Sequence, residues 1–204
     1  MLLSSIKSID TFHEPWTHHI FRNALSIEQI KEVQNANVIG YTMKKNDGTR
    51  SGQKDQNNAF REYITKDNCD NYPHLLSLVT ELQCKWLRNI ISELTQTNLE
   101  KSWVRVELLR DTNKFWLKPH IDIPEKLVSC MIYINQTDED MNLGTDLYNK
   151  NKEVIKTIPF EHNLGFMFNG QNALHGLERK KNIKVDRRGL QINYVNFETD
   201  WPVT

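Results

Sequence analysis

The amino-acid sequence predicts a mainly β domain with helices flanking the sheets. In the first half, apolar residues recur every three or four residues, as on one face of a helix, whereas from residue 101 the period changes toward two. The second half contains short apolar runs separated by polar turns, a pattern typical of a β-sandwich or barrel. A length of 204 residues is enough for one domain with a sizeable core.

Charge and composition exclude several classes of protein. Lys and Arg total 26, and Asp and Glu total 26, so no overall field attracts nucleic acid or an anionic membrane. No apolar stretch is long enough to span a bilayer, and the first ten residues lack the apolar core of a signal peptide. Three cysteines without CxxC spacing (Cys69, Cys84 and Cys130) favour free thiols in a reducing compartment. We therefore expect a cytoplasmic protein that binds neither nucleic acid nor membrane.

Two helices are predicted in the first half. Ser26 begins the first, with Gln29 three residues later as in a capping box. The longest helix is predicted over residues 73–96, where an apolar stripe indicates one buried face. The stripe consists of Leu75, Leu78, Val79, Leu82, Trp86, Ile90 and Leu94. The polar segment 44–58 is interpreted as a surface loop, either a solvated linker or a lid over a site.

Strands are expected through most of the second half. Segment 103–110 alternates at first between apolar and polar residues, and 126–135 is a nearly unbroken apolar run suited to a strand covered on both faces. A long strand at 187–197 ends the series. Three shorter strands are predicted between them, at 145–149, 154–160 and 164–168.

The residues with the clearest chemistry are His120 and Asp122. Two residues apart on a strand, they share a face, so both side chains can point at one metal ion. An imidazole and a carboxylate suit Fe(II), Mn(II) or Zn(II), although the HxD pattern alone is common. His175 follows 53 residues after Asp122, and an antiparallel barrel can return it to the same place. Two histidines and one carboxylate form the facial triad of non-haem Fe(II) oxygenases.

A pair of arginines, Arg187 and Arg188, begins the last predicted strand. An arginine at the end of a buried strand needs an anionic partner, because an unpaired buried charge is costly. The planar guanidinium matches a carboxylate through two hydrogen bonds. A dicarboxylate could therefore chelate iron at one end and meet this arginine at the other.

The order of these residues resembles the Fe(II)/2-oxoglutarate-dependent dioxygenases, and the prolyl-hydroxylase-like branch in particular. Residues 128–135 are similar to that branch's apolar strand ending in Tyr-Leu-Asn. Residues 143–147 stand where the family often has Gly-Gly, an acidic residue and Leu. The resemblance covers about residues 100–197, with weaker support from residues 12–35.

The resemblance implies a double-stranded β-helix, or cupin-like jelly roll, in a single domain of residues 1–204. Residues 1–99 would form a helical support region and residues 100–197 the catalytic core. It also implies that His120, Asp122 and His175 bind iron. With 2-oxoglutarate and dioxygen, and ascorbate as a candidate reductant, such a site hydroxylates a peptide, prolyl or small-molecule substrate and releases succinate and CO2. The alternative is a cupin-like metal- or ligand-binding jelly roll without oxygenase activity, which leaves the paired arginines unexplained.

Strand parity leaves open which arginine binds the co-substrate. Arg188 shares a face with the apolar residues of its strand, which would point inward in a simple barrel. The family pattern, however, is Arg, any residue, then Ser or Ala, and Gly189 provides such a small residue two positions after Arg187. We favour Arg187 for this reason.

Two further residues are candidates for the co-substrate site. Tyr133 matches a position whose phenol often supports the 2-oxoglutarate carboxylate, although an ordinary core tyrosine is an equal alternative. Gln191 lies on the same strand face as Arg187 and could add a hydrogen bond.

Overall fold

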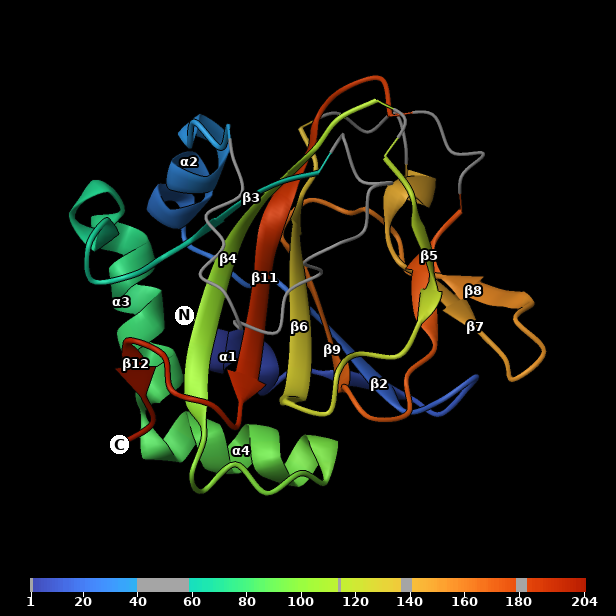
Figure 1. The fold of residues 1–204 in the computed structure, drawn as a ribbon, viewed down its shortest axis with the longest axis horizontal. Coiled ribbons are helices and arrows are strands. Elements are labelled where there is room, and N and C mark those ends of the chain that lie inside the picture. The colour runs from blue at the N-terminus through green and yellow to red at the C-terminus, as the bar shows by residue number, and fades with distance from the viewer. Residues whose placement is uncertain (1, 40–58, 114, 137–140, 179–182) are drawn as a thin grey trace.

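Two antiparallel sheets face each other in the computed structural model, which describes residues 2–39, 59–113, 115–136, 141–178 and 183–204 (Figure 1). The larger sheet has the order β1-β2-β9-β6-β11-β4-β12, with β3 also paired to β4, and the smaller has the order β5-β10-β7-β8. The strands are β1 (Asp10–Phe12), β2 (His18–Arg22), β3 (Ala59–Tyr63), β4 (Trp103–Asp111), β5 (Leu117–His120), β6 (Lys126–Ile134), β7 (Asp146–Tyr148), β8 (Val154–Thr157), β9 (Leu164–Asn169), β10 (His175–Leu177), β11 (Arg187–Val195) and β12 (Trp201–Pro202).

From β4 onward the chain passes repeatedly between the two sheets. Strands β4, β6, β9 and β11 belong to the larger sheet, whereas β5, β7, β8 and β10 belong to the smaller one. This alternation of antiparallel strands is the jelly-roll topology. The predicted fold class, mainly β with flanking helices, is confirmed.

The helices cover the outer face of the larger sheet (Figure 1). They are α1 (Leu2–Ile6), α2 (Ile27–Asn35), α3 (Pro73–Gln83) and α4 (Lys85–Thr95), with short 3-10 turns η1 (Cys69–Asn71) and η2 (Met141–Leu143). Their apolar side chains pack on alternate residues of β4, β6 and β11, including Val106, Ile132 and Ile192. A second core, which includes Leu147 and Phe166, lies between the two sheets. None of the described helices has the length and apolar character needed to cross a lipid bilayer.

The inward face of the larger sheet is unusually polar. On β4, Arg105, Glu107 and Asp111 alternate with buried valines and leucines, and all three are themselves buried. Gln191 and Asn193 of β11 lie on the same inward face. The apolar residues of these strands face the helices, so the polar residues face the interior between the sheets.

The predicted helix over residues 73–96 is wrong as one element, because the chain forms α3 and α4 with a break between them. Cys84 has extended backbone angles, φ −63° and ψ 126°. The first helix buries Leu78 and Leu82, as expected, but the second buries Leu87 and Ile91. An unbroken stripe would have buried Trp86, which is instead 47% exposed. The break therefore shifts the buried face by one residue.

Other expectations about the first half can be compared with the structure directly. The capping box of Ser26 and Gln29 is confirmed, with both reciprocal hydrogen bonds present. The three cysteines are free thiols, as predicted. Residues 1–99 contain strands β1, β2 and β3 of the larger sheet in addition to helices. Segment 44–58 lies outside the described residues.

His18 on β2 makes the stability of the fold sensitive to acid. Its Nδ1 donates to the carbonyl oxygen of Trp16 at 2.8 Å, and its Nε2 lies 3.3 Å from the ammonium nitrogen of Lys156. Burial, with a contribution from the positive charge of Lys156, lowers the pKa of His18 to about 4. Between pH 6.5 and 4 the unfolded chain therefore binds a proton at this residue that the folded chain does not.

We expect the free energy of unfolding to fall as pH drops below about 6.5, because protonation of His18 favours the unfolded state. The contribution of one histidine is at most about 1.4 kcal/mol for each pH unit. Urea unfolding at several pH values between 7.5 and 4.5 measures it. The variant His18→Phe, which suits the neighbouring rings of Phe12 and Phe166, should show a shallower pH dependence. An unchanged slope in this variant would contradict the assignment.

Candidate metal centre

The three predicted metal ligands meet at the edge of the smaller sheet. His120 is the last residue of β5 and His175 the first of β10, and the antiparallel ladder pairs these two residues directly. Asp122 follows β5 after one residue. Ligand atoms of the three side chains all lie within 4.8 Å of one another. The structure therefore brings together His120, Asp122 and His175 as one cluster.

Backbone carbonyls orient both imidazoles. The Nδ1 atom of His120 is 3.0 Å from the carbonyl oxygen of Lys118, and that of His175 is 2.8 Å from the carbonyl oxygen of Ala173. A carbonyl oxygen only accepts, so each Nδ1 carries a proton, and in the neutral imidazole this leaves Nε2 as the nitrogen that can bind a metal. Such contacts orient histidine ligands in metal sites.

Asp122 is held in its ionised form. Ser129 donates its hydroxyl to Oδ2 at 2.6 Å, and the ammonium of Lys126 donates to Oδ1 at 3.0 Å. Burial on its own would raise the pKa of Asp122. The charge of Lys126, the nearby His175 and the hydrogen bond from Ser129 outweigh that effect and hold this pKa well below its usual range. Each carboxylate oxygen keeps further lone-pair capacity for a metal ion.

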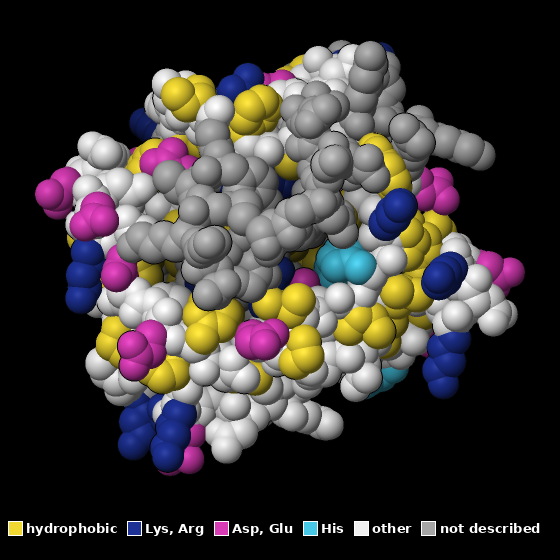
Figure 2. Space-filling view, viewed as in Figure 1, with side chains coloured by type: hydrophobic (Ala, Val, Ile, Leu, Met, Phe, Trp, Pro, Cys, Tyr) yellow, Lys and Arg dark blue, Asp and Glu magenta, His cyan; other side chains and the backbone are white. Residues whose placement is uncertain are grey.

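The donor set fits a divalent transition metal. Two neutral imidazoles and one carboxylate are ligands of borderline hardness, and together they can occupy one face of an octahedron. Within the described parts of the chain, this is the only group of three such side chains found close enough to hold an ion. In the space-filling view, histidine side chains reach the surface beside apolar side chains (Figure 2).

A small cavity of about 40 Å³ lies beside the cluster, between the two sheets. Its lining includes His175, Arg187 and Gln191. Arg187 donates Nε to the carbonyl oxygen of Leu143 and Nη1 to Oδ2 of Asp111, both at 2.6 Å. The guanidinium is therefore buried at the wall of the space next to a candidate metal ligand.

Arg188 lies on the other face of β11. Its guanidinium donates to the carbonyl oxygen of Ala36 at 2.9 Å, where α2 ends. Burial lowers the pKa of Arg188. Consecutive strand residues point to opposite faces, so only one of the two arginines can line the cavity. Arg187 occupies that position, and Arg188 joins helix α2 to the sheet.

The remaining predicted residues also lie on inward faces. Tyr133 is buried with its hydroxyl 2.6 Å from Oγ1 of Thr145, and the guanidinium of Arg187 lies 5.3 Å from the centre of its ring. The Gln191 amide is placed to donate to Glu107 at 3.1 Å and to accept from Lys126 at 3.2 Å. Tyr133 therefore adjoins Arg187, whereas Gln191 reaches toward the lysine that holds Asp122.

Gly189 stands where the dioxygenases that the sequence resembles have Ser or Ala. A Cβ atom at this position would collide with the carbonyl oxygen of Ile132 on the neighbouring strand β6. The serine or alanine of the family therefore cannot be placed here without moving one strand. Close approach of β11 and β6 requires glycine, and no hydroxyl is available at this position.

Sequence reasoning missed four side chains that support these groups: Arg61, Asp111, Lys126 and Ser129. The alternation of polar and apolar residues on β4 was a usable signal for Asp111, because its face also contains Arg105 and Glu107. Nothing in the sequence indicates Lys126 and Ser129 as partners of Asp122, since both belong to β6, which begins after the turn that follows Asp122.

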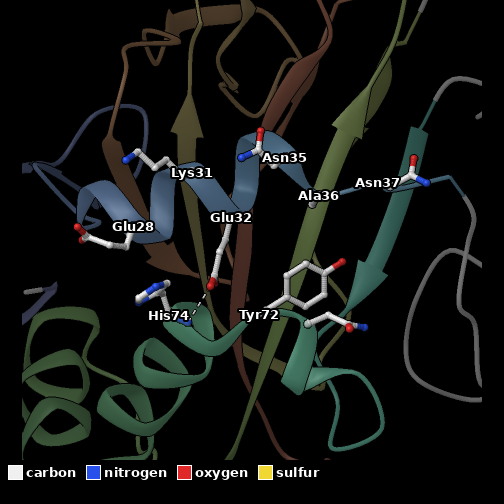
Figure 3. Close-up of a pocket in the computed structure, with 9 residues that line it drawn as sticks. Glu28, Lys31, Glu32, Asn35, Ala36, Asn37, Tyr72 and His74 are labelled. Carbon is white, nitrogen blue, oxygen red and sulfur yellow. Dashed lines mark hydrogen bonds between the residues drawn. The ribbon is translucent and has the colours of Figure 1, made fainter.

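A larger hollow, of about 340 Å³, lies between α2 and α3, away from the metal ligands (Figure 3). Glu32 reaches across it and accepts hydrogen bonds from the backbone nitrogens of His74 and Leu75, at 2.9 and 2.8 Å. Gln29 also donates to the carbonyl oxygen of His74. The carboxylate thus caps the first turn of α3. The hollow therefore lies where α2 is joined to α3 by hydrogen bonds.

Comparison with known proteins supports the architecture. The sequence matches no family model and no curated protein. The solved structures that are similar in fold include three prolyl hydroxylases. A Pseudomonas putida prolyl-4-hydroxylase is 12% identical with a TM-score of 0.50, over 69% of this chain and 73% of that one. A Phytophthora capsici prolyl 4-hydroxylase is 17% identical with a TM-score of 0.53, over 70% of this chain and half of that one.

The third similar structure is a Trichoplax adhaerens prolyl hydroxylase in complex with a peptide fragment of the hypoxia inducible factor oxygen degradation domain. It is 17% identical with a TM-score of 0.55, over 88% of this chain and 83% of that one. Identities this low establish the fold alone. The chain therefore has the jelly-roll fold that these prolyl hydroxylases share.

Proposed function

We propose that this protein is a non-haem Fe(II)- and 2-oxoglutarate-dependent oxygenase. It would hydroxylate a peptide, prolyl or small-molecule substrate and release succinate and CO2. The observation that supports this proposal most strongly is the position of Arg187, whose guanidinium lines the same cavity as His175. A dicarboxylate that meets Arg187 at one end can reach the metal centre with its other end.

In this proposal His120, Asp122 and His175 hold the iron, which supplies oxygen activation when bound. The backbone carbonyls of Lys118 and Ala173 hold the Nδ1 side of each ring, so that Nε2 of each imidazole would bind the ion. Ser129 and Lys126 keep Asp122 ionised and fix its orientation.

Arg187 would bind the distal carboxylate of 2-oxoglutarate, with the ring of Tyr133 as one wall of the subsite. The ring of Phe160 lies 5.4 Å from the same guanidinium. Apolar walls exclude water and so strengthen the attraction between a guanidinium and a carboxylate.

The prime substrate would approach from the solvent side of the metal centre. The side chain of His120 is 27% exposed, and Ile121, between two of the ligands, is 49% exposed. An apolar contact beside the metal is therefore available from outside. The peptide held by the Trichoplax adhaerens enzyme supports a peptide as one substrate class, and a small molecule is the other.

The test is turnover of 2-oxoglutarate by the purified protein. With Fe(II), dioxygen and ascorbate as the proposed reductant, we expect slow formation of succinate even without prime substrate. Omitting Fe(II), or replacing it with Zn(II), should stop succinate formation. Metal binding without any 2-oxoglutarate binding or turnover would instead support the cupin-like binding protein.

A further inference from the structure

Asp111 is a buried carboxylate shared by two arginines. Asp111 is 0% exposed, and Arg61 and Arg187 are 6% and 5% exposed. Nη1 of Arg61 lies 2.6 Å from Oδ1, and Nη1 of Arg187 lies 2.6 Å from Oδ2. We call these three side chains the arginine–aspartate group.

The sheet places these side chains together. Strand β4, which ends at Asp111, pairs with β3 on one side and with β11 on the other. On β11, Arg187 pairs with Asp111. On β3, Ala59 pairs with Asp111, and Arg61 follows two residues later on the same face of the strand. Arg61 belongs to residues 1–99, which the family resemblance implied to be a support region.

The arginine–aspartate group has a net charge of +1, because two guanidiniums meet one carboxylate. A net charge in a buried place is costly unless a counter-charge reaches it. Both guanidiniums also line the cavity beside His175. Aromatic rings surround them, with Phe115 at 5.6 Å from Arg61 and Tyr133 at 5.3 Å from Arg187. A single carboxylate entering the cavity would complete the charge balance.

We propose that Arg61 is a positioning residue for the co-substrate, a proposal that rests on the function proposed above. By engaging one oxygen of Asp111, Arg61 offsets part of its charge and leaves Arg187 with attraction for a second carboxylate. Without Arg61, Asp111 and Arg187 would form a neutral pair, and the cavity would lose its net charge. Asp111 thus competes with the co-substrate for Arg187, and Arg61 weakens this competition by pairing with Asp111.

Substitutions of Arg61 and of Asp111 should have opposite effects on the affinity for 2-oxoglutarate. Arg61→Met should weaken 2-oxoglutarate binding about tenfold or more, because it neutralises the group. Asp111→Asn should strengthen binding, because it raises the charge of the group to +2. The double variant Arg61→Met/Asp111→Asn leaves Arg187 alone at +1 and should restore affinity close to that of the unsubstituted protein. A purely structural role predicts losses in both single variants and no rescue.

The measurement is calorimetric titration of 2-oxoglutarate into the full chain loaded with Mn(II), which supports binding without turnover. Arg110→Met is the matched control, because Arg110 neighbours Asp111 on β4 but faces outward and pairs with Asp186. Arg61→Lys keeps the charge and should retain most of the affinity. In turnover assays Arg61→Met should raise KM for 2-oxoglutarate far more than it lowers kcat.

The outcomes separate the two proposals. If the unsubstituted protein binds metal but not 2-oxoglutarate, the proposed function fails and this inference fails with it. If it binds 2-oxoglutarate and Arg61→Met binds equally well, the inference alone is overturned. Weaker binding by Asp111→Asn, with no rescue in the double variant, would also overturn it.

Discussion

His175→Ala should abolish Fe(II) binding and with it all turnover of 2-oxoglutarate. Its imidazole supplies one of three donor atoms that lie within 4.8 Å of one another, and two donors cannot form a facial triad. We expect metal affinity to fall by more than about 100-fold, since changes in mere supporting contacts already cost 10–100-fold. Asp122→Asn should act similarly, because it removes the negative charge that faces the ion. Calorimetric titration of Mn(II) under neutral conditions measures both.

A matched control comes from another histidine of the same fold. Nδ1 of His162 is 2.7 Å from the carbonyl oxygen of Asn135, the same kind of backbone contact that orients His120 and His175. His162 is not part of the cluster, so His162→Ala should bind metal normally. Thermal unfolding of the metal-free variants checks that each is folded. Undiminished metal affinity in folded His175→Ala would place the ion elsewhere.

The grouping of the three candidate ligands was predictable because it depends on the short spacing of two residues and on one pairing between distant strands. The short spacing of His120 and Asp122 keeps the two side chains close without any tertiary information, although the predicted common strand was wrong, because β5 ends at His120 and Asp122 lies just beyond it. The position of His175 required the pairing of β5 with β10, and a sequence does not specify which strands pair. The family resemblance supplied that link, and the ladder places the two histidines directly opposite each other.

The choice between the two arginines shows why strand parity alone was insufficient. Alternation identifies two faces, but it does not say which face meets the helices. Here Leu190 and Ile192 pack against helices, so the polar face with Arg187 turns inward. Asp111 likewise lies on the polar, inward face of β4. The break at Cys84 had no comparable signal, because neither glycine nor proline marks it.

Arg187→Met should weaken 2-oxoglutarate binding by about 10–100-fold while leaving metal affinity unchanged. The variant removes the guanidinium from the cavity, and hydrogen bonds to charged groups account for a loss of this size. Asp111 keeps its contact with Arg61, so no carboxylate is left buried without a cation. Titration of 2-oxoglutarate into the Mn(II)-loaded protein measures the change, and turnover should show a raised KM.

Arg188→Met is the control that makes this result specific, since it removes an equal charge from the adjacent residue. It should cost about 1 kcal/mol of unfolding free energy, because Arg188 bonds the carbonyl oxygen of Ala36 at the end of α2. Its affinity for 2-oxoglutarate should be unchanged, because its guanidinium lies on the helix side of the sheet. Equal losses of affinity in the two variants would mean that overall charge matters rather than position. A loss confined to Arg188→Met would move the carboxylate site to the outer face of β11 and contradict the proposed mechanism.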